Sequence, residues 1–139
     1  MSHRSVIEPV LRLALAFLLA LPIGWDRERR SRSAGLRTYP LLSTCACGFL
    51  LLGQELAAGA TARADVFYGL LTGIGFVGSG AMMKSPDGAR GMDTAVSLWV
   101  TGAIGAGVAF GAGQVSAALA VVSVVALRAR KPRAATGRA

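Results

Sequence analysis

Acidic residues are scarce in this chain, and their placement limits what it can transport. Only seven of the 139 residues are aspartate or glutamate, and all seven lie at the ends of apolar runs or between them: Glu8, Asp26, Glu28, Glu55, Asp65, Asp87 and Asp93. Carboxylates near the middle of a membrane segment mark proton and cation pathways. Their absence there argues against a simple ion pump and leaves room for a polar site at one membrane face.

Catalytic and metal-binding patterns are also missing. His3 is the single histidine and lies at the terminus, so it supplies no catalytic dyad. Cys45 and Cys47 would point to nearly opposite faces of a helix and could not readily bond to each other. We interpret them as small apolar residues rather than copper ligands. We therefore predict no enzyme and no cofactor, and the sequence leaves any metal unknown.

Aromatic residues make up 6% of the chain, which bears on its net charge of +8. Nucleic-acid binding would require aromatic residues interleaved with a basic face, and no such face is present. The basic residues instead form clusters beside apolar runs. We expect their partner to be the lipid bilayer with its anionic headgroups, and no nucleic acid.

Long apolar runs are what the sequence has in abundance. Five of them approach the length needed to cross a bilayer, at about residues 8–24, 36–53, 65–83, 93–110 and 113–127. The last two nearly merge, so the turn between them depends on Gly111 and Gly113. We predict an all-α integral membrane protein with one transmembrane domain over residues 1–127. Residues 128–139 are predicted to be a basic, disordered cytoplasmic tail without room for a soluble C-terminal domain.

Charge placement predicts the orientation of these segments. With the N-terminus outside and the C-terminus inside, twelve basic residues fall on the inner side and Arg4, Arg12 and Arg63 on the outer side. Positive charge is retained on the cytoplasmic side of bacterial membranes. We therefore predict a multi-pass membrane protein with this orientation. Arg12, inside the first run, is expected to extend toward the outer interface.

Glycine is concentrated in the third and fourth runs, where it permits close helix packing. The alternative is a broken helix that exposes carbonyl groups to an ion. We expect packing, within one chain or between chains, and a homo-oligomer or another membrane protein complex as the partner. The predicted packing positions are Gly69, Gly73, Gly75, Gly78, Gly80, Gly102, Gly105, Gly107 and Gly111.

A polar cluster is predicted where several runs meet the cytoplasmic face. We call this set the polar collar: Asp26, Arg27, Glu28, Arg37, Arg90 and Asp93. Asp26 with Arg30, and Glu28 with Arg32, have the four-residue spacing of helical ion pairs. The collar is either a solvated set of salt bridges that enforces topology or a sheltered site that binds a partner helix, an ion or a headgroup.

Three segments together resemble the membrane domain of the MgtC/SapB family. They are GWDRERRSRSAGLRT (24–38), TGIGFVGSGAMM (72–83) and RGMDTAVSLWVTGAIG (90–105). The first resembles the family's G-L-E-R-E and A-G-L-R-T-H patterns, with Tyr39 in place of the histidine. The third resembles the family's R-G-L-T-T-A-A pattern, with Asp93 in place of the first threonine.

The resemblance implies a bacterial inner-membrane protein linked to adaptation to low magnesium. It implies a regulator of other membrane machines, the proton-driven ATP synthase among them, rather than a magnesium carrier. We therefore expect a regulator of ion homeostasis that acts through helix–helix contacts. The alternatives are an oligomeric transporter or channel subunit for a cation or small solute, and a structural membrane module.

Overall fold

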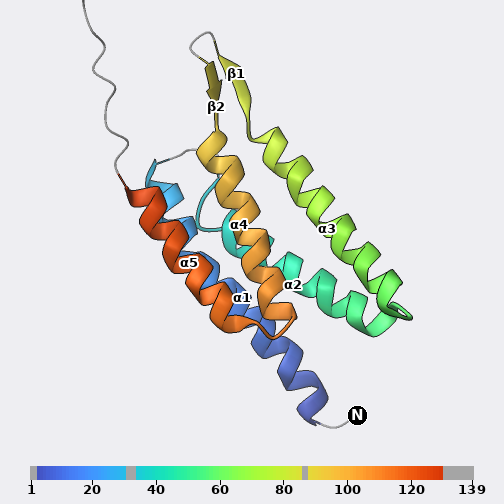
Figure 1. Cartoon of the computed structure of the whole chain (residues 1–139). Helices are drawn as coiled ribbons and strands as arrows, with labels where there is room; N and C mark the ends of the chain where they lie inside the picture. Colours follow the sequence, from blue (N-terminus) through green and yellow to red (C-terminus); the bar gives the residue numbers. More distant parts are fainter. Residues whose placement is uncertain (1–2, 31–33, 86–87, 130–139) are drawn as a thin grey trace, which may run out of the picture.

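The described residues of the protein form a bundle of five helices with one short hairpin (Figure 1). The computed structural model describes residues 3–30, 34–85 and 88–129. The helices are α1 (His3–Arg30), α2 (Thr38–Leu56), α3 (Ala60–Gly80), α4 (Met92–Ala109) and α5 (Gly113–Arg128). Each predicted apolar run forms one helix, which confirms the helical class.

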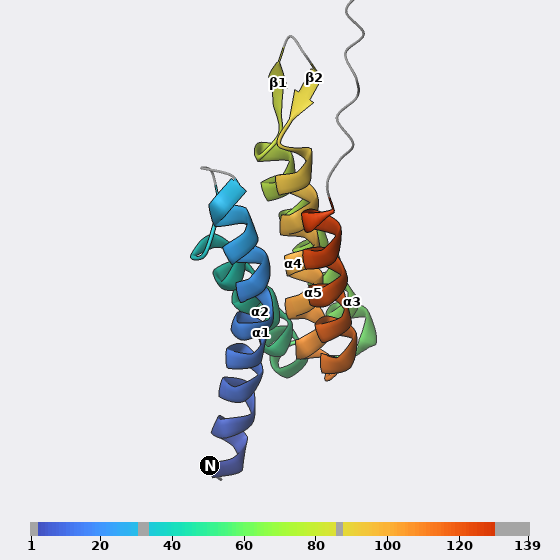
Figure 2. The same cartoon turned by 90° about the vertical axis from the view of Figure 1, so that its left-hand side faces the viewer.

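Helix α4 lies at the centre and contacts the other four helices. Helices α1 and α2 lie side by side against it, and α5 packs along α4 and α1 (Figures 1 and 2). Helix α3 lies at the edge, where only Ile74 and Gly78 are buried among its residues. The bundle therefore encloses α4 and leaves α3 largely uncovered.

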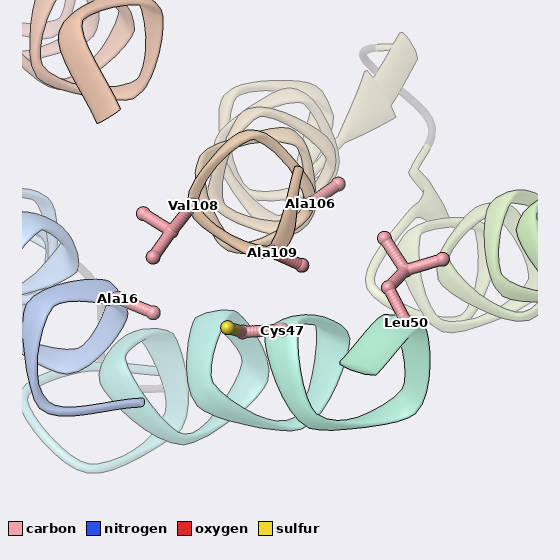
Figure 3. Close-up of a cluster of buried hydrophobic side chains, with 6 residues drawn as sticks. All are labelled: Ala16, Cys47, Leu50, Ala106, Val108 and Ala109. Carbon is pink, nitrogen blue, oxygen red and sulfur yellow. The ribbon is translucent and has the colours of Figure 1, made fainter. Parts of the chain in front are cut away.

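Two buried clusters form the core, one of mostly small side chains and one that contains Ile23, Tyr39, Leu98 and Ile104. The first cluster brings together residues from α1, α2 and α4 (Figure 3): Ala16, Cys47, Leu50, Ala106, Val108 and Ala109. Large apolar side chains such as Leu18, Phe49 and Phe76 instead lie on the outside. Bulky apolar residues on the outside, with small residues such as Ala16 and Ala109 where helices meet, suit helices that pack closely within lipid.

Two of the described helices are long and apolar enough to cross a membrane, over Val6–Arg30 and Met92–Ala109. Helix α5 is apolar but shorter. Helix α1 continues well beyond Gly24, where the predicted apolar run ends, so the charged residues that follow are helical up to Arg30. Arginine and glutamate are good helix formers, and the Asp26–Arg30 pair supports this extra turn.

Three glycines in the connections have positive φ, and the first of them, Gly59 with φ 92°, lies between α2 and α3. Gly91 has φ 89° and joins the hairpin of β1 (Met83–Ser85) and β2 (Gly88–Arg90) to α4. The antiparallel pairing of Met83 with Arg90 was not predicted from the sequence. Gly111 has φ 77° and lies between α4 and α5, which confirms the predicted turn. Glycine adopts this conformation at little steric cost.

Candidate functional site

Asp26 and Arg27 are buried at one end of the bundle, where α1 and α5 end and α2 and α4 begin. We call this the collar end. Their exposed fractions are 5% and 8%. Charged side chains are seldom buried to this extent unless they are paired. This part of the polar collar is therefore enclosed by protein rather than solvated.

Asp26 joins α1 to α5. Its Oδ1 accepts a hydrogen bond of 3.4 Å from Arg128 Nε, and its Oδ2 lies 3.3 Å from Arg30 Nε. The second contact is an ion pair without hydrogen-bond geometry, since Oδ2 has no hydrogen-bond partner. The predicted Asp26–Arg30 pair is confirmed. Arg128, predicted to begin the tail, is the last residue of α5; residues 130–139 lie outside the described part of the chain.

Arg27 joins α1 to α4. Its Nη2 donates a buried hydrogen bond of 2.8 Å to Thr94 Oγ1 in the first turn of α4. The Nε of Arg27 is buried and has no hydrogen-bond partner. Thr94 was not among the predicted site residues, because the contact spans 67 positions and has no local signal in the sequence.

Glu28 fixes the connection between α1 and α2 rather than joining Asp26. Its Oε2 accepts a hydrogen bond of 2.9 Å from the N–H of Leu36. Gly35 lies directly against this carboxylate, so that a side chain at position 35 would displace the carboxylate from its bond with the N–H of Leu36. Arg32, its predicted partner, lies outside the described residues.

A buried hydroxyl pair joins α2 to α4 at the same end. Tyr39 Oη and Ser97 Oγ lie 2.9 Å apart, and either atom can donate. Ser97 is also within hydrogen-bond distance of the carbonyl oxygens of Asp93 and Thr94. The sequence identified Tyr39 only as a departure from the family pattern, whereas the structure gives its hydroxyl a definite partner.

The other collar residues lie outside this enclosed group. Arg37 precedes α2 and is exposed, and Arg90 and Asp93 are exposed near the start of α4. Arg90 and Asp93 each make a polar interaction. In the described ranges, no group of three or more histidine, cysteine, aspartate or glutamate residues is placed to hold a metal ion. The enclosed centre of the collar end consists of Asp26, Arg27 and Thr94.

Arg12 binds backbone at the opposite end of the bundle. Its Nη1 donates a hydrogen bond of 2.7 Å to the carbonyl oxygen of Ala109, and its Nη2 lies 2.6 Å from Glu8 Oε1. Gln54 Nε2 donates to the same carbonyl at 3.2 Å. Arg12 therefore extends to the end of the bundle that the predicted topology places at the outer interface, where it supplies a donor to one of the last carbonyl groups of α4.

The predicted packing glycines divide into two groups. Gly78, Gly102, Gly105 and Gly107 face neighbouring helices inside the chain, and Gly105 lies against the Ser43 carbonyl of α2. A side chain at any of the others would meet nothing within 4 Å: Gly69, Gly73, Gly75, Gly80 and Gly111. Gly69 and Gly73 line an apolar groove of about 460 Å³ between α2 and α3.

The free thiols occupy different environments, as expected. Cys47 is buried in the core of α1, α2 and α4, whereas Cys45 is exposed and lines the α2–α3 groove. Two residues apart, they lie on different faces of α2, which confirms the orientation predicted from helical geometry.

Apolar helices, small residues at helix contacts and a charged cluster at one end are typical of a helical membrane protein. The family model of the MgtC family matches residues 13–135, and the chain belongs to this family. It is 41% identical over 118 residues to Protein MgtC of Brucella abortus, covering 84% of this chain and 48% of that protein. It is 36% identical over 126 residues to Protein MgtC of Salmonella typhimurium, covering 90% and 53%.

The chain thus spans about half the length of the curated relatives it matches. No solved structure matches it.

Proposed function

We propose that this protein acts in the bacterial inner membrane as a regulator of ion homeostasis, and that magnesium is the main ion concerned. In this proposal it acts through contacts between its helices and those of a second copy or of another membrane complex. Its membership of the MgtC family supports the proposal, as do relatives that carry the name Protein MgtC. The polar collar fixes the orientation of the helices that make the contacts.

The proposed topology has five spans, with the N-terminus outside and the C-terminus inside. Helices α1 and α5 end, and α2 and α4 begin, at the same end of the bundle (Figure 2). Most arginines of the described chain gather there, and positive charge is retained in the cytoplasm. The collar end would then face the cytoplasm and the Arg12 end the outside.

The open face of α3 carries the proposal of helix contacts. Gly69 and Gly73 are one turn apart with nothing within 4 Å, on a helix that buries only two residues. A second helix can approach such a face closely. Within this chain, α3 makes its main contacts with α4 and fewer with α2, so this face is available to a partner.

Growth at low magnesium tests the role of the collar. A deletion strain is expected to grow poorly only at low magnesium and to be rescued by the wild-type gene. Asp26→Asn should not rescue it, because the variant removes the charge that both Arg30 and Arg128 contact. Growth across a magnesium titration is the measurement, with immunoblots to verify equal amounts of protein in the membrane.

Glu8→Gln is the matched control for this experiment. It removes one carboxylate from the same helix, in an exposed pair with Arg12 at the opposite end. Exposed pairs contribute at most about 1 kcal/mol, so this variant should rescue growth. If the deletion strain grows normally at every magnesium concentration, magnesium is removed from the proposal.

Transport is tested separately with pure protein in liposomes. The groove between α2 and α3 is lined almost wholly by apolar residues, and so is a second groove beside α4 that contains Gly75 and Trp99. Ions need charged or carbonyl groups along their path. We therefore expect no magnesium, sodium or proton flux above protein-free liposomes. Flux that Asp26→Asn abolishes would instead establish a transporter.

A further inference from the structure

Arg27 is a buried cation for which the described chain supplies no ion-pair partner. Its guanidinium bonds to the neutral hydroxyl of Thr94, and its Nε is left without a partner. The ion pairs of Asp26 go to Arg30 and Arg128 instead. A buried charge without an opposite charge beside it is strongly destabilising. An anion beside Arg27 would offset that cost.

The start of α4 adds a second feature that favours an anion. Helix α4 follows Gly91 and has no side-chain cap. The N–H groups of an uncapped first turn lack helical partners, and the helix dipole places partial positive charge there. Thr94, the hydrogen-bond partner of Arg27, belongs to this turn. The guanidinium is thus held against the positive end of a helix.

The acids nearby are already engaged or lie outside the enclosed group. Asp26 contacts two arginines, and one oxygen of Glu28 accepts the N–H of Leu36. Asp93, in the first turn of α4, offsets part of the helix dipole, but it is exposed and makes a polar interaction of its own. The described collar end holds more arginines than acids: Arg27, Arg29, Arg30, Arg37, Arg90 and Arg128 against Asp26, Glu28 and Asp93.

We infer that Arg27 and the first turn of α4 bind a phosphate group, either on a lipid headgroup or as free inorganic phosphate. The Nε–H of Arg27 has no partner but is buried, so a phosphate oxygen would accept its charge-assisted hydrogen bond only after neighbouring side chains move; the uncapped N–H groups of α4 offer partners to the other oxygens. A tetrahedral phosphate has enough acceptor oxygens for both. This inference rests on the proposed function, because it gives the polar collar a ligand.

Binding to the purified full chain in detergent micelles tests the inference without any growth phenotype. One arm titrates phosphatidylglycerol, followed by native mass spectrometry, with oleate as an anionic lipid that lacks phosphate. The other arm titrates inorganic phosphate against chloride at equal ionic strength, followed by thermal unfolding. Saturable binding in the first arm alone identifies a lipid headgroup, and in the second alone free phosphate. No binding in either arm, or equal binding of oleate, overturns the inference.

Two lysine variants separate a built site from general positive charge. Arg27→Lys keeps the charge but loses the Nε–H and the planar guanidinium. We expect its affinity for the phosphate ligand to fall about tenfold or more. Arg29→Lys is the control, since Arg29 is exposed and lies 4.9 Å over the ring of Trp25. Its affinity should stay within about twofold. Equal losses in the two variants contradict a site at Arg27.

Thr94→Val covers the case in which Arg27→Lys does not fold. It keeps every charge and removes the hydroxyl that holds the guanidinium against α4. We expect weaker phosphate binding with an unchanged helical circular dichroism spectrum. If Thr94→Val binds the phosphate ligand as tightly as the wild-type protein, the inferred site between Arg27 and the first turn of α4 is wrong. Failure of binding with a retained magnesium phenotype would remove the phosphate site and leave the proposed function in place.

Discussion

Gly105→Leu is expected to prevent the protein from folding as a stable bundle. Any side chain at Gly105 would collide with the backbone carbonyl of Ser43, at the point where α2 approaches α4. Overpacking a core costs about 1–3 kcal/mol, and a collision with backbone lies at or above the upper end of that range. Thermal unfolding in detergent, followed by circular dichroism, should show a large fall in Tm or aggregation during purification.

Gly69→Leu is the matched control, since it makes the same change at a glycine with nothing within 4 Å. Its Tm should stay close to that of the wild-type protein. Equal destabilisation by the two variants would mean that α2 and α4 do not approach each other as described. A stable Gly105→Leu protein would lead to the same conclusion.

Gly73→Leu is expected to abolish association through α3 while the single chain remains folded. The new side chain would fill the open groove between α2 and α3 and hold a second helix away from the backbone of α3. Close approach at small residues drives much of helix association in membranes. Size-exclusion chromatography with light scattering in mild detergent, and cross-linking in membranes, should show the assembled species lost.

Gly75→Leu provides the comparison for this assembly experiment. Gly75 is also open, but two residues along a helix it lies on nearly the opposite side of α3 from Gly73. If the Gly69–Gly73 face makes the contact, this variant should still assemble. If Gly75→Leu dissociates the assembly and Gly73→Leu does not, the contact lies on the other face of α3.

The positions of the helices could be predicted from the sequence because they follow from local composition. Apolar runs bounded by charge or glycine marked all five helices, and Gly111 marked the turn before α5. The end of α1 was placed too early, because the prediction followed the apolar run and stopped at about residue 24. Charged residues at four-residue spacing can extend a helix beyond its apolar run, as Asp26 and Arg30 do here.

The site could be predicted only in part, for a related reason. The Asp26–Arg30 pair is local and was visible in the spacing. Three other contacts join helices that are far apart in the sequence: Arg27 with Thr94, Asp26 with Arg128 and Tyr39 with Ser97. They depend on how the helices are rotated in the bundle, which no short pattern records. Rotation also decides which glycines face a neighbouring helix and which stay open, as Gly105 and Gly73 illustrate.

The contacts of α1 with both ends of α4 have a consequence for motion. Arg12 donates to the carbonyl of Ala109, and Arg27 donates to Thr94. The number of residues between the two arginines on α1 equals the number between their two partners on α4, which runs antiparallel to α1. Sliding one helix along the other by a turn would break both bonds at once. The position of α1 along α4 is therefore fixed at both ends. Any conformational change in this protein would have to leave this pair of helices in place and move the loosely packed α3.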